Sequence, residues 1–157
     1  MESNATAVYL VSCVRRKQAC TAREMYVSDW FVKARRYAEA SGCRWFILSA
    51  EYSLVTPDRV IAPYERTLNT MPVTERRAWA GGVFKQLAAA VPELSHVVFL
   101  APERYREFLA GHLTGRGVAV SLPMEGLRIG EQLSWLGQHP PQPLGCVRAN
   151  QLGLRRS

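Results

Sequence analysis

AVYLVSCV, residues 7–14, is a continuous run of apolar and β-branched side chains without alternating polar residues. Such a run predicts a β-strand that is buried on both faces, because an exposed face would place a polar residue at every second position. Strands of this kind are typical of parallel sheets that are covered by helices. The stretch therefore favours an α/β fold.

Further strands and helices alternate along the rest of the chain. Three more apolar runs predict strands: CRWFILSA (residues 43–50), HVVFLA (96–101) and GVAVSL (117–122). Apolar residues at helical spacing predict helices between Tyr26 and Gly42, from Val73 to Val91, after Pro102, and in the second half of residues 123–136. We expect an α/β fold with three layers: a mostly parallel four-stranded sheet with helices on both faces.

The length of 157 residues, with 48% hydrophobic residues, fits a single domain over residues 1–157. Residues 51–72, EYSLVTPDRVIAPYERTLNTMP, are too rich in Pro and turn residues for a regular element, and loops of this length usually have a function. Residues 139–157 contain three prolines and are expected to be a wrapping or frayed tail.

The balance of charge points to anionic partners. Twenty Lys and Arg residues against thirteen Asp and Glu residues leave a net charge of +7, and 17 of the 20 are Arg. Arg suits bidentate recognition of phosphate, so a nucleotide or a nucleic acid is the expected partner. A basic surface that serves only solubility is the alternative.

Several classes of protein are not expected. No apolar run reaches the length of a membrane span, and there is no signal peptide, so we expect a cytoplasmic protein that does not contact a membrane. The cysteines form no CxxC pair, which predicts reduced thiols and no metal site. Phosphate-binding fingerprints and the GxSxG elbow are absent, so no cofactor is expected. The four cysteines are Cys13, Cys20, Cys43 and Cys146.

Ligands of open α/β sheets bind outside the carboxyl ends of the strands, which nominates the residues that follow each predicted strand. Pro102 with Glu103 and Pro123 with Glu125 follow the third and fourth strands. The first two strands and their loops supply the predicted substrate-binding residues Ser12, Arg15, Arg16, Tyr26, Ser49, Tyr52 and Tyr64. The three tyrosines could stack on a nucleobase or simply pack.

Four residues are candidates for catalysis. Cys13 could be a nucleophile activated by nearby cations, or a small residue that closes a buried strand. Lys17 could bind phosphate, act as an amine nucleophile, or be solvated. Glu51 and Glu65 could be acid/base groups, since desolvation at the end of a buried strand raises a carboxyl pKa, or surface glutamates.

Several motifs together resemble an uncharacterised bacterial domain family. They are LVSC with Lys17 (residues 10–17), SAEYSLV with Pro57 (49–57), APYE with Thr67 and Leu68 (62–68), and GLRIGEQLSWL (126–136). The strand-end cysteine with its lysine, and the strand followed by an APY loop, are similar to the core domain of archaeosine synthase. More distantly, they resemble peroxide-stress DNA-binding proteins and the uracil-DNA glycosylase fold. These resemblances imply that the protein handles a nucleobase or a nucleic acid.

The chain departs from the family pattern at three positions. Glu51 and Ser53 stand where the family motif SAKYGL has Lys and Gly, and Glu65 stands where Asp commonly follows APY. The change at Glu51 replaces a cation by an anion in the expected site.

We expect an enzyme that cleaves or exchanges an N-glycosidic bond in a nucleotide or nucleic acid. Glu51 or Glu65 would activate water or stabilise an oxocarbenium-like sugar, and residues 15–17 would hold phosphate. One alternative is a nucleic-acid-binding protein without catalysis. The other, implied by the resemblance to archaeosine synthase, is modification of a purine or deazapurine base by Lys17 or Cys13.

Overall fold

A computed structural model describes residues 6–12, 20–21, 29–61 and 67–139 of the chain. It contains a five-stranded sheet in the order β4-β3-β1-β6-β7. The parallel strands are β1 (Thr6–Ser12), β3 (Arg44–Ser49), β6 (Leu94–Leu100) and β7 (Ala119–Ser121), and β4 (Ser53–Val55) runs antiparallel to β3. The expected α/β fold with a mostly parallel sheet is confirmed.

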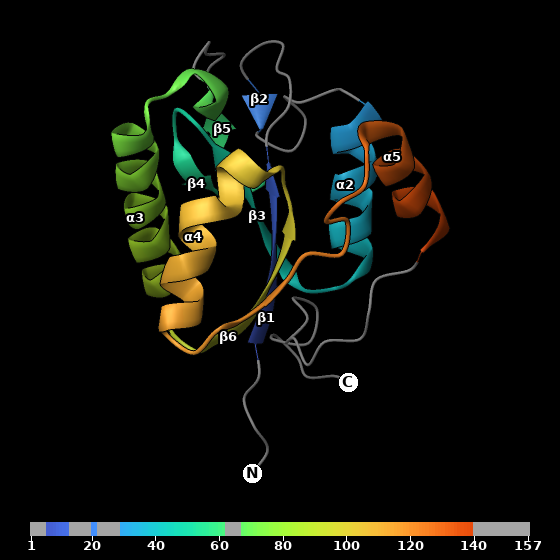
Figure 1. Ribbon diagram of the computed structural model, residues 1–157. Helices are drawn as coiled ribbons and strands as arrows, with labels where there is room; N and C mark the ends of the chain where they lie inside the picture. Colours follow the sequence, from blue (N-terminus) through green and yellow to red (C-terminus); the bar gives the residue numbers. More distant parts are fainter. Residues whose placement is uncertain (1–5, 13–19, 22–28, 62–66, 140–157) are drawn as a thin grey trace, which may run out of the picture.

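Helices cover both faces of this sheet. Figure 1 shows α3 (Val73–Ala90) and α4 (Glu103–Gly115) on one side and α2 (Asp29–Ala40) and α5 (Ile129–Gln138) on the other. The expected three layers are therefore present. Residues 140–157, which contain most of the expected tail, lie outside the described part of the chain.

The expectation of four strands was wrong, because residues 51–72 are not one irregular loop. They include β4, which pairs with β3, and β5 (Val60–Ile61), which pairs with β2 (Cys20–Thr21) in a second, two-stranded sheet. A 3₁₀ helix, η1 (Leu68–Thr70), follows. These elements have two or three residues each, too few to show a periodic pattern, so for β4 and β5 the pairing with another strand decides the conformation.

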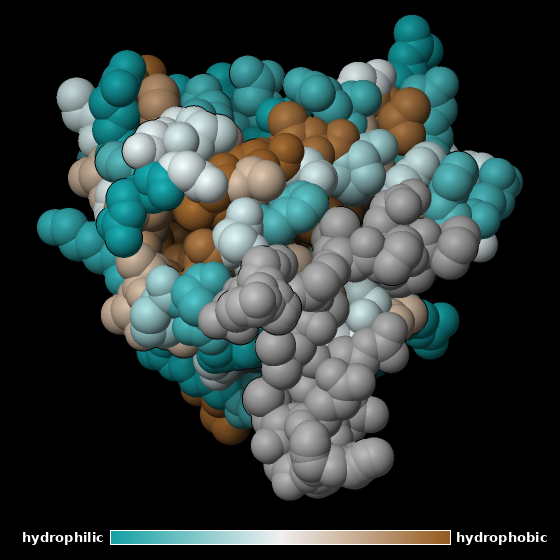
Figure 2. Space-filling view, turned by 90° about the horizontal axis from the view of Figure 1, so that it is seen from below, coloured by the Kyte–Doolittle hydropathy of each residue, from teal (hydrophilic) through white to brown (hydrophobic). Residues whose placement is uncertain are grey.

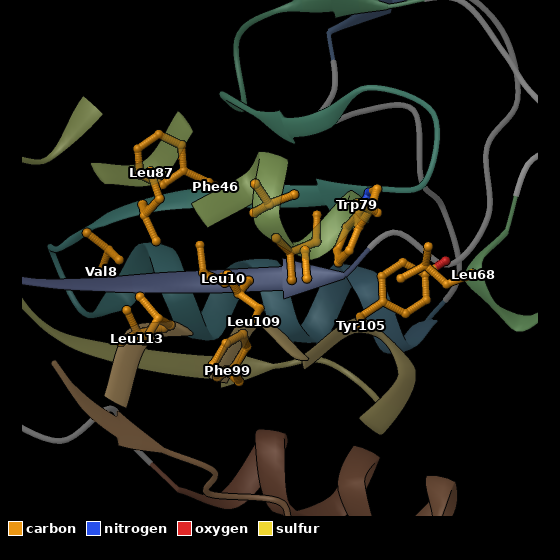
Figure 3. Packing of buried hydrophobic residues seen from close by; sticks show 14 of the residues in the cluster. Val8, Leu10, Phe46, Leu68, Trp79, Leu87, Phe99, Tyr105, Leu109 and Leu113 are labelled. Carbon is orange, nitrogen blue, oxygen red and sulfur yellow. The ribbon is translucent and has the colours of Figure 1, made fainter. Parts of the chain in front are cut away.

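The central strand β1 is buried along its whole length, as the apolar run predicts. Its side chains alternate between two cores. Tyr9 and Val11 pack under α2 and α5, whereas Val8 and Leu10 pack under α3 and α4. In the second core, Trp79 and Tyr105 lie around the end of β1 (Figure 3). Strand β1 therefore contributes side chains to both cores and connects the two helical layers.

The surfaces at the two ends of the parallel strands differ in their residues. Seen from below, on the side where β1 begins, hydrophobic residues occupy the middle of the surface and hydrophilic residues surround them (Figure 2). At the opposite ends of the parallel strands, Glu51, Glu103 and Glu125 follow β3, β6 and β7.

One expectation about the cysteines was wrong. Cys43 is buried and disulfide-bonded, so the prediction of reduced thiols does not hold for this residue. The side chains of the other three cysteines lie outside the described part of the chain.

Candidate functional site

The strand order reverses between β1 and β6. The chain passes from β1 to its neighbour β3 and then crosses to β6 on the other side of β1. At such a point the loops that follow the two strands diverge to opposite faces, and ligands bind in the crevice that is left outside the strand ends. The end of β1 is therefore the geometric centre of the candidate site.

Ser12, the last residue of β1, has an unusual environment. Its side chain is fully buried, and its hydroxyl oxygen has no hydrogen-bond partner among the residues that the structure describes. Most buried polar groups in folded proteins have a partner, because an unmade hydrogen bond is costly in a medium of low polarity. The predicted contact of Ser12 with substrate stays a prediction.

A cavity of about 220 Å³ lies at the ends of β6 and β7, on the β6 side of the crevice. Glu103 lines it from the first turn of α4 and Arg106 from the next turn, while Glu125 comes from the loop after β7. The sequence nominated Glu103 and Glu125 by their positions after two strands, and the structure brings both to one cavity. Two carboxylates and one guanidinium can together bind and polarise a small polar ligand.

Gln132, from α5, also lines this cavity and is held in place by two hydrogen bonds. The indole nitrogen of Trp30 donates to Gln132 Oε1 over 2.7 Å, and Gln132 Nε2 donates to the carbonyl oxygen of Leu127 over 2.8 Å. Sequence reasoning missed both Arg106 and Gln132. Arg106 lies one helical turn after Glu103, a spacing that could have indicated it, but Gln132 reaches the cavity only through the packing of α5 on α2.

The turn that follows β3 is organised by Ser49. Its buried Oγ accepts hydrogen bonds from the backbone nitrogens of Glu51 (3.2 Å) and Tyr52 (2.9 Å), and its carbonyl oxygen accepts one from the indole nitrogen of Trp79 (2.9 Å). The hydroxyl of Ser49 therefore shapes the turn that presents Glu51. Its predicted contact with substrate stays a prediction.

Glu51 and Tyr52 occupy different positions in this turn. Glu51 is exposed at the C-terminal edge, whereas Tyr52 is half-buried against the core under α2. The guanidinium of Arg59 lies 5.1 Å from the centre of the Tyr52 ring. This contact is a cation–π interaction, so a base that stacks on Tyr52 would have to share or displace the Arg59 group.

Arg76 connects the end of residues 51–72 to helices α3 and α4. It is buried, its Nη1 donates to the carbonyl oxygen of Met71 over 2.7 Å, and its Nε donates to Glu107 Oε2 over 3.0 Å. The two contacts join η1, α3 and α4 next to the strand ends. The arginine thus has a positioning role that its charge alone would not have indicated.

Seven of the predicted site residues lie outside the described part of the chain, so their roles stay predictions. They are Cys13, Arg15, Arg16, Lys17, Tyr26, Tyr64 and Glu65. Among the residues that the structure describes, no group of three or more His, Cys, Asp or Glu side chains is placed to hold a metal ion. No helix in the same residues is long and apolar enough to cross a membrane.

Fold and cavity together define an α/β protein with a polar cavity beside the switch point of a mostly parallel sheet. The model of a family of unknown function (DUF6884) matches residues 8–138, and the chain belongs to this family. No curated protein and no solved structure matches the chain. The resemblance to an uncharacterised domain family is confirmed, whereas the likeness to archaeosine synthase and to the DNA-binding relatives stays a prediction.

Proposed function

We propose that the protein is an enzyme that cleaves or exchanges an N-glycosidic bond in a nucleotide or nucleic acid, at the C-terminal edge of its sheet. The observation that carries the proposal is the convergence of Glu103, Glu125 and Arg106 on one cavity beside the switch point. In hydrolysis of such a bond, the anomeric carbon loses the base and gains the hydroxyl of water, and the base takes up a proton. A carboxylate can accept the proton from water, and a carboxylic acid can give a proton to the leaving base.

One carboxylate would accept a proton from the attacking water or stabilise the positive charge that develops on the sugar. Arg106 would bind an anionic group of the substrate, because a guanidinium matches the geometry of phosphate. Gln132, whose position is fixed, would use the second hydrogen of its amide nitrogen to orient the base. In this arrangement Glu103 and Glu125 are the acid/base groups, in place of Glu51 and Glu65, which the sequence predicts for this role.

The size and position of the cavity limit how a substrate could bind. About 220 Å³ is below the range of roughly 300–1,000 Å³ that is usual for pockets of drug-sized ligands, so a base or a pentose fits better than a whole dinucleotide. Glu51 follows β3, two strand spacings from β6, or about 10 Å along the edge. Glu51 would then contact a part of the substrate that lies outside the cavity, while acid/base catalysis at the glycosidic bond stays with Glu103 and Glu125.

The direct test is to incubate the purified protein with nucleoside monophosphates and with short single- and double-stranded DNA and RNA, and to look for free bases by mass spectrometry. We expect one substrate to release its base. Glu103→Gln and Glu125→Gln should lower the rate by about 100-fold or more, as expected for loss of acid/base catalysis. Glu93→Gln is the matched control, because this exposed glutamate lies just before β6, at the opposite edge. Equal rates in all variants would refute the assignment.

A nucleic-acid-binding protein without catalysis is the second candidate, and the net charge of +7 favours it. It predicts that no base is released and that nucleic acid is retained on a filter with steep dependence on salt. The affinity would then survive Glu103→Gln and Glu125→Gln. These outcomes separate the two candidates in the same set of samples.

A further inference from the structure

A second and larger hollow lies between α2 and α5, in the helical layer opposite α3 and α4. This groove measures about 550 Å³ and shares no lining residue with the cavity at the ends of β6 and β7. Its α2 residues come from Lys33 to Ala40, the last turns before β3 starts. Because α2 runs from the end of β1 back to the start of β3, these turns lie away from the C-terminal edge of the sheet. The groove is therefore a separate place on the molecule.

The charges of the groove are all positive. Lys33 and Arg36 line it, whereas no Asp or Glu does. Neither cation forms an ion pair within the described residues, in contrast to Arg35 on the same helix, which lies 3.6 Å from Glu39. Ala40, Leu136 and Gly137 are apolar residues of its lining. Apolar lining residues beside two cations that form no ion pair with described residues are complementary to an anion that carries an apolar or aromatic part.

A series of aromatic rings leads from the central strand to this groove. Tyr9 of β1 contacts Tyr37 (ring centres 6.0 Å apart), Tyr37 contacts Trp135 (5.1 Å), and Trp135 stacks on His139 (4.8 Å, 17° between planes). The Nδ1 atom of His139 donates to the carbonyl oxygen of Trp135 over 3.0 Å, which holds the imidazole flat on the indole. His139 is exposed, so the series ends in a fixed ring at the surface.

From these observations we propose that the α2–α5 groove binds a nucleotide unit, with its base stacked on His139 and its phosphate bound by Lys33 and Arg36. Nucleobases stack on aromatic side chains, histidine included, and lysine and arginine bind phosphate through charge-assisted hydrogen bonds. A free nucleotide and one unit of a single strand share this chemistry. The proposal does not depend on the reaction proposed for the cavity.

Binding can be measured on the full chain with two probes: adenosine monophosphate by calorimetry, and a fluorescein-labelled single strand of about twelve thymidines by anisotropy. The variant Lys33→Gln/Arg36→Gln removes both cations. Gly137→Glu places a carboxylate in the groove, while Gly137→Ala adds only a methyl group, whose nearest neighbour is Lys33 Nζ at 3.6 Å. Lys85→Gln/Arg104→Gln is the control with the same change in charge, on exposed positions of α3 and α4.

We expect Lys33→Gln/Arg36→Gln and Gly137→Glu to bind at least one probe about tenfold more weakly, or worse, than the unchanged chain, because charge-assisted contacts are lost. Gly137→Ala and the control pair should bind normally. With the single strand, removal of two phosphate contacts should lower the slope of log affinity against log salt by about 1.4. Binding of the mononucleotide alone identifies a free nucleotide as the ligand, and binding of the strand alone a polymer. No binding of either probe, or equal weakening by the control pair, overturns the proposal.

Discussion

Replacing Ser12 by alanine should make the protein more stable and its ligand binding weaker. The Ser12 hydroxyl is fully buried without a hydrogen-bond partner in the described part of the chain, and in mutational data such a group destabilises a fold by about 1–3 kcal/mol. Alanine removes the oxygen and leaves only a small void, so we expect a gain of about 1 kcal/mol in the free energy of unfolding. For a chain of this size that gain raises the melting temperature by about 2–4 °C. Urea denaturation and calorimetry would measure both quantities.

Ser49 is the matched control, because it has the same side chain, the same complete burial and a place at the same edge of the sheet. Its hydroxyl, however, accepts two backbone hydrogen bonds, each with a net contribution of about 0.5–1.5 kcal/mol. Ser49→Ala should therefore destabilise the fold by about 1–3 kcal/mol. If Ser12→Ala also destabilises the protein by more than about 1 kcal/mol, its hydroxyl has a structural partner and the argument for a ligand contact fails.

Four further predictions concern stability. Arg76→Met should lower the free energy of unfolding, measured by urea denaturation, by about 2–4 kcal/mol. The charge-assisted hydrogen bonds of the buried arginine are lost, and the half-buried Glu107 loses its partner. A loss below about 0.5 kcal/mol would contradict this role. Burial, and then the charge of Tyr37, raises the pKa of Tyr9 to about 12, so the folded state retains this proton up to higher pH and stability should fall between pH 10 and about 12. Tyr9→Phe should reduce that slope by up to about 1.4 kcal/mol per pH unit, and an unchanged slope would argue against it. Gly137→Ala, within helix α5, should stabilise the fold by up to about 1 kcal/mol in thermal melts, and a lower melting temperature would show a clash. Ser53→Gly should stabilise by about 0.5–1 kcal/mol, since Ser53 has a φ of 65°, which glycine adopts more easily; a loss of stability would show that the serine side chain matters.

The parts of the fold that the sequence predicts are those whose pattern is set by burial. Residues 7–12 read as a continuous apolar run because both faces of β1 are covered, and Val73–Ala90 reads as a helix because one stripe of its residues contacts the sheet. The hairpin of β3 and β4 lacks such a signal. Its turn depends on Ser53 in a left-handed conformation, which serine adopts less readily than glycine, so the residue type does not indicate the turn.

Some residues of the candidate site can be predicted from the sequence and others cannot. Residues that follow a strand directly, such as Ser12, Glu103 and Glu125, can be nominated from the sequence, because the carboxyl ends of parallel strands share one edge. Gln132 cannot, since it reaches the cavity only when α5 packs on α2 and Trp30 binds its side chain. Arg76 is similar, because nothing in its local sequence shows that it is buried between two helices.

The excess of basic residues lies mostly in segments outside the described residues. The described residues contain twelve basic and ten acidic side chains, whereas the rest of the chain contains eight basic and three acidic ones. Most of the net charge of +7 therefore belongs to sequence outside the described ranges, including Arg15, Arg16 and Lys17 directly after β1. At the edge itself, the described side chains Glu51, Glu103 and Glu125 are acidic, with Arg106 and Arg59 beside them. For a phosphate-bearing substrate, Arg106 is the described cation that lines the cavity, and the carboxylates would remain available for acid/base chemistry on the neutral part of the substrate.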